Sequence, residues 1–139
     1  MFCREHAVQL RDDEERFLEV GAGVAFIGAG SLEAGARFAE ERSLWFPVFI
    51  SPKREAHRLY GVTRGSWNQV AGPRLAARAL KASARKETRQ GKVTSDPRQM
   101  AGTFVVSTGG VIRLAHRNRD SADNPSNEVI FRSIEGLAT

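Results

Sequence analysis

The sequence predicts an α/β domain built on one core. Two short and nearly continuous apolar runs, GVAFIGAG (residues 23–30) and FPVFI (residues 46–50), are typical of buried parallel strands. Segments with helical spacing alternate with these runs, and such alternation favours strands layered between helices. With 139 residues, 41% of them hydrophobic and 27% charged, the chain has the size and composition of one globular domain, residues 1–139.

The N-terminal half alternates helices with the two strands. Apolar positions recur at helical spacing over residues 4–20, and Gly21 stops this helix. The segment SLEAGARFAEERS (residues 31–43) predicts an amphipathic helix with Leu32, Ala36 and Phe38 on its inner face. Pro52 then begins a short helix that ends at Gly61.

The C-terminal half predicts a helix, a hairpin and a final helix. Pro73 starts a helix that runs to about Gln90. The segments TFVV and VIRLAH, joined by STGG, predict two hairpin strands. Asn124 and Pro125 are expected to cap the final helix, in which residues 130, 134 and 137 share an apolar face.

A β-hairpin followed by a packing helix, after strand–helix–strand units, describes the three-layer α/β/α thioredoxin-like fold. That fold places a strand directly before the cysteine-bearing helix, whereas this chain starts at the helix. We therefore expect a thioredoxin-like fold that lacks the first strand or strands. The neighbouring strands would then have unpaired ladders, so we expect weak stability or a homo-oligomer formed through the exposed sheet edges.

The net charge of +5 comes from one segment. The predicted helix 73–90 carries a basic stripe at Arg74, Arg78, Lys81 and Arg85, which could bind phosphates or an anionic surface. No aromatic residue interleaves the stripe, so a solvated helical face is favoured and no specific nucleic acid is expected. The sequence has no membrane-length apolar run and no signal core, and a single cysteine cannot form an internal disulfide. A cytoplasmic protein without membrane partners is the expectation.

Cys3 is the strongest candidate for a chemically reactive residue. A helix N-terminus stabilises a thiolate, Arg4 adds a cation, and His6 could reach back to the thiol. The alternative is an ordinary cysteine near a terminus. The loop after the last strand, LAHRNRDSADNP (residues 114–125), is dense in polar groups, including Arg117 and Asp120, and predicts either a polar site or a self-bonded rigid loop.

No metal and no cofactor are expected. The three histidines have no paired-ligand spacing with Cys3 or with acidic residues. Gly28 and Gly30 match the first two glycines of a dinucleotide-binding turn, but Glu33 occupies the place of the third. A plain strand-to-helix turn is the favoured interpretation.

Several segments in order resemble the peroxiredoxin-like proteins of the AhpC/TSA group, in the branch that carries C-x-x-C before REH. They are FCREHAVQLRDDEERF, VAFIGAGS, FPVFISPKREAHRLYGV and QMAGTFVVSTGGVIRLAHRNRDSADNP. The resemblance makes Cys3 the second cysteine of the motif, with the first falling just before Met1. The arginine that typical peroxiredoxins place before the TFVV strand is replaced by Ala101-Gly102, where the thioredoxin cis-proline is also absent.

The resemblance implies a thiol oxidoreductase that reduces a peroxide or disulfide substrate with an external thiol reductant. It implies that Cys3 is the redox residue. Arg117 and Asp120, in the loop after the last strand, are expected as further contributors near the same face, because strand C-termini and helix N-termini converge there in α/β folds. Because the chain keeps one thiol, turnover would need a partner thiol. The alternatives are a catalytically silent thioredoxin-fold binding module and, more weakly, attachment to anionic surfaces through the basic helix.

Overall fold

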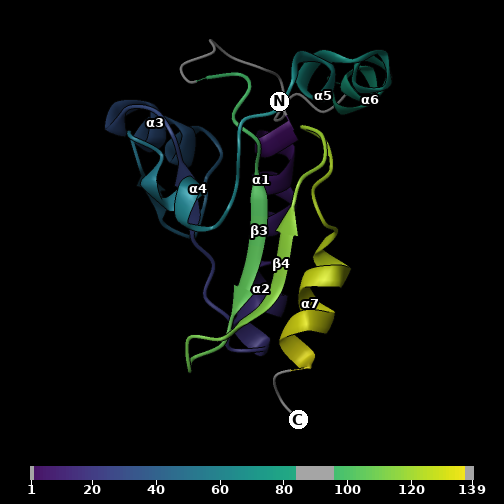
Figure 1. Cartoon of the computed structure of the whole chain (residues 1–139). Coiled ribbons are helices and arrows are strands. Elements are labelled where there is room, and N and C mark those ends of the chain that lie inside the picture. Colours follow the sequence, from purple (N-terminus) through teal and green to yellow (C-terminus); the bar gives the residue numbers. More distant parts are fainter. Residues whose placement is uncertain (1, 84–95, 137–139) are drawn as a thin grey trace.

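The computed structural model describes residues 2–83 and 96–136 and shows the predicted alternation of helices and strands (Figure 1). The elements are α1 (Phe2–Asp12), α2 (Glu14–Glu19), β1 (Phe26–Gly28), α3 (Leu32–Glu41), β2 (Val48–Ile50), α4 (Glu55–Leu59), α5 (Trp67–Ala71), α6 (Pro73–Ser83), β3 (Gly102–Val106), β4 (Ile112–Arg117) and α7 (Asn127–Glu135). None of the helices within the described residues has the length and apolar character that a membrane span requires.

The strands form two separate sheets. β1 and β2 are parallel, with Ile27 opposite Phe49, as the apolar runs predicted. β3 and β4 form the predicted antiparallel hairpin, with Thr103 opposite His116 and a register shift after Val105. Within residues 2–83 and 96–136, no strand joins β1 to β3. The described strands therefore form two two-stranded sheets and not one continuous sheet.

Helices cover the hairpin on one face. Figure 1 shows α7 beside β4, with α1 and α2 behind the hairpin and α3 and α4 on its other side. Val105 of β3 packs in one core with Leu10 of α1, Phe17 of α2 and Phe131 of α7. The hairpin is thus anchored to the N-terminal helices by apolar side chains.

The single helix predicted over residues 4–20 is two helices in the structure, α1 and α2, so the prediction is wrong in this respect. Asp13 separates α1 from α2, with a φ of −102° and a ψ of 24° that lie outside the helical range. Its carbonyl still accepts a hydrogen bond from the N–H of Phe17 (3.1 Å), so α2 starts directly. Gly21 ends the pair as predicted, with a φ of 67° that suits glycine.

The predicted inner face of α3 is also partly wrong. Leu32 is 74% exposed and Ala36 is exposed as well, whereas Gly35 is buried. A Cβ atom on Gly35 would lie 2.6 Å from Cδ1 and 2.9 Å from Cγ1 of Ile50. The helix therefore approaches β2 through a glycine, a contact that hydrophobic periodicity does not reveal.

The helices of the C-terminal half differ from the predictions in two places. A short helix, α5, precedes α6 where the sequence predicted no element, and the predicted end of the basic helix near Gln90 lies outside the described residues. Ser126, and not Asn124, occupies the N-cap position of α7, without a capping hydrogen bond from its side chain. The side chain of Asn124 instead donates to the carbonyl of Phe2 (3.3 Å). Leu137, predicted on the apolar face of this helix, also lies outside the described residues.

The contact of Gly35 with Ile50 gives a stability prediction. We expect Gly35→Ala to lower the free energy of unfolding by about 1–2 kcal/mol, because overpacking costs about 1–3 kcal/mol and outweighs the helix propensity that alanine adds. Urea denaturation measures the change. Gly23→Ala is the matched control, since no atom lies within 4 Å of that added Cβ, and it should be near neutral.

The double variant Gly35→Ala/Ile50→Val separates a steric clash from a backbone effect. Removing Cδ1 of Ile50 takes away the nearest clashing atom, so the double variant should recover part of the loss relative to the sum of the single variants. Strictly additive losses would contradict the packing explanation.

Candidate functional site

A cavity of about 1380 Å³ is bordered by both sheets. Its walls include all of β1 and β3, residues of α1 and α3, and the loop at 121–124. We call this space the inter-sheet cavity. Cys3, in the first turn of α1, and His6, one turn further on, both line it. Because residues three apart lie on one face of a helix, these two side chains share a wall of the cavity.

Cys3 is a free, exposed cysteine. The protein groups packed around this wall raise the pKa of its thiol above the ordinary value, because they remove water that would stabilise the thiolate. A backbone hydrogen bond acts in the opposite direction and lowers the pKa of Cys3, but desolvation outweighs it. The thiol is reachable from the cavity and predominantly protonated near neutral pH.

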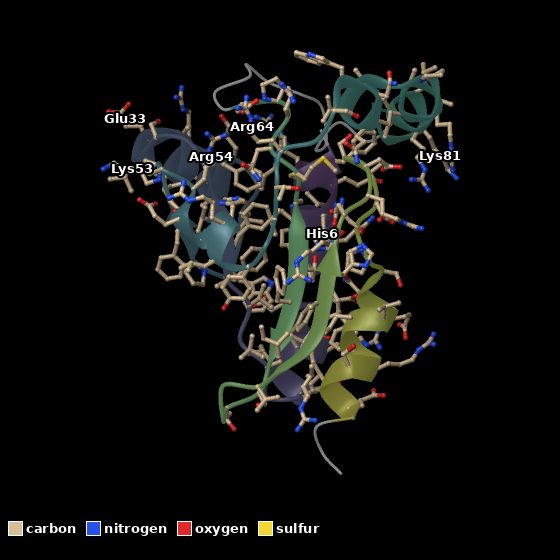
Figure 2. All side chains as sticks on the ribbon, in the orientation of Figure 1. His6, Glu33, Lys53, Arg54, Arg64 and Lys81 are labelled. Carbon is tan, nitrogen blue, oxygen red and sulfur yellow. The ribbon has the colours of Figure 1, made fainter. Side chains whose placement is uncertain are left out.

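His6 does not reach back to Cys3, contrary to the expectation. The residue is 6% exposed, and its Nε2 lies 3.4 Å from Oγ1 of Thr103 on β3 (Figure 2). Burial lowers the pKa of His6 to about 4, with a further contribution from the charge of His116. Its Nδ1 is buried and finds no hydrogen-bond partner among the described residues. The imidazole is therefore neutral at physiological pH.

The side chains of the polar loop after β4 form hydrogen bonds within the same loop. A self-bonded rigid loop is one of the two alternatives that the sequence predicted. Oδ2 of Asp123 accepts from the backbone N–H (2.9 Å) and Nε (3.2 Å) of Arg119, and the Asp123 carbonyl lies 2.6 Å from Nε2 of His116. Burial alone would raise the pKa of Asp123, but the hydrogen bonds and charge of Arg119 together hold it below its usual range. Oδ1 of Asp120 accepts from the N–H of Ala122 (2.9 Å). These bonds account for the density of polar groups in the loop.

Arg117 points to the other side of the hairpin. Its Nε donates to the carbonyl of Tyr60 (2.7 Å), and its guanidinium lies 5.3 Å from the centre of the Phe104 ring. Neither Arg117 nor Asp120 lines the inter-sheet cavity, whereas Cys3 does. Of the three predicted site residues, only Cys3 belongs to the cavity lining, although Tyr60 and Phe104, which Arg117 contacts, line the cavity as well.

The loop beside the cavity also contributes residues that the sequence did not single out. Asn124 links the loop to α1, because it donates to the carbonyl of Phe2 and accepts from Asn118 (2.8 Å). Oγ of Ser121 is buried and has no hydrogen-bond partner among the described residues. Both Asn124 and Ser121 line the cavity. An Asn or Ser in a polar loop carries no sequence signal that separates such a role from an ordinary turn.

An ion-pair cluster fixes another part of the cavity wall. Asp96 binds Arg54 (3.1 Å) and Arg64 (2.7 Å), and these two arginines lie near each other in Figure 2. The backbone N–H of Arg98, together with the two guanidinium groups, lowers the pKa of Asp96. The cluster ties the segment before β3 to the end of β2. Asp96, Arg54 and Arg64 therefore have a structural role in this part of the wall.

The remaining motifs lie in α3, in α6 and in the turn after β1. The turn after β1 leads into α3, where Oγ of Ser31 accepts from the N–H of Ala34 (3.1 Å) as an ordinary N-cap. No group of His, Cys, Asp or Glu within the described residues could hold a metal ion. On α6, Arg74, Arg78 and Lys81 are exposed, and Figure 2 shows Lys81 at the molecular surface far from His6. Arg85 lies outside the described residues.

Parallel and antiparallel strand pairs between helices, with a cysteine in the first turn of a helix beside them, define the class of thioredoxin-like redoxin domains. Residues 9–120 match the sequence pattern of the AhpC/TSA antioxidant enzyme family. The chain belongs to this family, as the resemblance predicted.

Two curated relatives are similar over most of the chain. Human peroxiredoxin-like 2C is 27% identical in an alignment that covers 92% of this chain and 61% of the relative. Mouse peroxiredoxin-like 2C is 26% identical with the same coverage. The chain thus spans about three fifths of the length of the curated relatives it matches.

The buried, neutral His6 predicts how stability depends on pH. Its pKa is about 4 in the folded chain and about 6.5 when unfolded, so the unfolded state binds the proton more tightly. The free energy of unfolding should therefore fall by up to about 3 kcal/mol as the pH drops from 6.5 to 4. Urea denaturation across this range measures the loss.

His6→Gln should remove most of this pH dependence, because it deletes the titrating group. His57→Gln is the control: His57 is less buried, and although burial also lowers its pKa, we expect this variant to keep most of the slope. An unchanged slope in His6→Gln would contradict the assignment.

Proposed function

We propose that this protein is a thiol-dependent oxidoreductase that reduces a peroxide or a disulfide, with Cys3 as its redox residue and an external thiol as reductant. Membership of the AhpC/TSA antioxidant enzyme family supports a redoxin-type function. The observation that carries the finer proposal is the exposure of the Cys3 thiol to the inter-sheet cavity.

With a peroxide, the Cys3 thiolate attacks one oxygen of the O–O bond. An S–O bond forms, the O–O bond breaks, and the leaving alkoxide or hydroxide takes a proton, so that sulfur is oxidised by two electrons to sulfenic acid. Because the chain has one cysteine, an external thiol must then displace water to give a mixed disulfide. A second external thiol releases Cys3 and leaves as the oxidised disulfide of the reductant.

The cavity wall sets the conditions for this reaction. Neutral His6 provides no positive charge to stabilise the thiolate, and the raised pKa of Cys3 keeps the thiolate fraction small near neutral pH. Reaction should therefore be slow at neutral pH and accelerate as the pH rises. Arg117 and Asp120 are proposed only as indirect contributors, because they shape the loop and the hairpin that border the site.

Activity should depend entirely on Cys3. We expect Cys3→Ser to abolish the peroxide consumption that the wild-type chain catalyses with dithiothreitol, measured by loss of hydrogen peroxide. Wild-type protein alkylated with iodoacetamide is a matched control, since it modifies the same single thiol without a mutation. Equal rates for the wild type and Cys3→Ser would refute the proposal.

The pH dependence of alkylation tests the state of the thiol independently of turnover. Because the pKa of Cys3 is raised, the rate of reaction with iodoacetamide should still be increasing at pH 9. Mass spectrometry of the quenched protein gives the rate. A rate that reaches its plateau near pH 7 would show an activated thiolate and contradict the assigned environment.

A catalytically silent binding module is the second candidate, and the raised pKa of Cys3 is the observation that favours it. In that case the fold would present a surface and the thiol would serve no turnover. The two candidates differ in one result: a silent module has the same negligible peroxide consumption before and after alkylation, at pH 9 as well as at pH 7.

A further inference from the structure

The outer face of α6 carries positive charge that its own segment does not balance. Arg74, Arg78 and Lys81 are four and three residues apart, so they share one face of the helix, and all three are exposed. The stretch from Trp67 to Ser83, which holds α5 and α6, contains no aspartate and no glutamate. Like charges at these spacings repel one another and lower the stability of the helix. An anionic partner would remove this cost.

Carboxylates elsewhere in the protein do not neutralise these three side chains. Arg16 shows the usual arrangement, because it forms an ion pair with Glu128 (2.6 Å). Within residues 2–83 and 96–136, no ion pair joins a carboxylate to a basic residue of α6. The neighbouring helix α1 contributes Glu5, but Arg4 beside it in the sequence offsets that charge. The positive charge of α6 is therefore available to a partner from outside.

An exposed leucine borders the basic residues. α6 packs inward through Leu75, which is 5% exposed, whereas Leu80 is 78% exposed. Ala77 is exposed as well, and it lies three residues before Leu80 and four before Lys81. Because such spacings place side chains next to one another, Ala77 connects Leu80 to the basic residues on the helix surface. The solvent side of α6 thus presents cations next to apolar carbon.

We propose that the outer face of α6 binds the surface of a membrane that contains anionic phospholipids. Arg74, Arg78 and Lys81 contact the phosphate groups, and Leu80 enters the boundary between headgroups and acyl chains. An anionic bilayer uses both the cations and the leucine, whereas a nucleic-acid backbone would use the charges alone. The contact is peripheral and needs no spanning helix. It goes beyond the proposed redox function and does not depend on Cys3.

The position of α6 suits contact with a broad surface. Figure 1 shows α5 and α6 together at one end of the molecule, with the hairpin turn at the opposite end. In Figure 2, Lys81 lies at one side of the molecule, and Glu33 and Lys53 lie at the other. A bilayer that approaches the Lys81 side therefore meets the basic residues and not the carboxylate of Glu33.

Cosedimentation with lipid vesicles tests the proposal on the whole chain. The probes are vesicles of phosphatidylcholine alone and vesicles in which about one third of the lipid is phosphatidylserine. At about 0.1 M salt we expect binding to the phosphatidylserine vesicles that is at least tenfold tighter than binding to phosphatidylcholine. Raising the salt to about 0.5 M should weaken the binding at least fivefold, because the headgroup charges are then screened.

Two double variants with the same net charge separate α6 from the rest of the surface. Each basic residue near an anionic bilayer strengthens binding roughly fivefold, so Arg78→Gln/Lys81→Gln should weaken it roughly 25-fold. The matched control is Arg37→Gln/Lys53→Gln, which removes two exposed cations from α3 and from the turn before α4. Both double variants lower the net charge from +5 to +3, yet the control should change binding less than about threefold.

The variant Leu80→Ser distinguishes a bilayer from a soluble polyanion. It should weaken vesicle binding roughly fivefold, because the leucine no longer enters the acyl boundary. A short DNA duplex, added at the same phosphate concentration as the vesicles, should fail to displace the protein from them. Far-UV circular dichroism checks that every variant is folded.

Four results would overturn the proposal. They are equal binding to the two kinds of vesicle, equal weakening in the two double variants, vesicle binding that Leu80→Ser leaves unchanged, and displacement by the DNA duplex, which would assign a nucleic acid instead. The comparison of vesicles uses the wild-type chain, so it holds even if a variant fails to fold. Alkylation of Cys3 should leave vesicle binding unchanged, so loss of peroxide activity and loss of membrane binding are separate outcomes.

Discussion

The aromatic contacts of Phe17 hold the two sheets in one domain. Phe17 is 2% exposed, and its ring lies 4.5 Å from that of Phe131 on α7 and 6.0 Å from that of Trp45, which precedes β2. Nε1 of Trp45 donates to the carbonyl of Arg11 at the end of α1 (3.2 Å). Since no described strand connects β1 to β3, these side chains replace the backbone ladder that would normally unite the strands. The inter-sheet cavity follows from this arrangement.

The same cavity determines the chemistry of the candidate site. It exposes Cys3 to small molecules, yet the groups packed around its wall disfavour the thiolate and the imidazolium. A peroxidatic cysteine works best when a nearby positive charge stabilises its thiolate. Here Arg117 faces Tyr60 on the other side of the hairpin, and the arginines at 54 and 64 are bound to Asp96. Arg4 lines the cavity beside Cys3, yet desolvation still holds the pKa of the thiol above its ordinary value.

Much of the fold could be predicted from the sequence because it depends on local signals. Apolar runs located β1 and β2, the STGG turn located the hairpin, and Gly21 located the end of α2. The inner face of α3 could not be predicted, because Gly35 contributes by having no side chain against Ile50. The break at Asp13 leaves no trace in the apolar spacing. Similarly, the neutral state of His6 comes from tertiary burial under Thr103, which residue spacing cannot reveal.

The central claim is that β1 and β3, which both border the cavity, each have one edge without a strand partner within residues 2–83 and 96–136. Amide hydrogen exchange of the free protein at low concentration tests it directly at two neighbouring residues of β3. The account predicts slow exchange at Thr103, which bonds to β4, and fast exchange at Phe104, which faces the cavity. Equal protection of the two amides, with matching protection at Ile27, would show that the edges are already paired and would contradict the account.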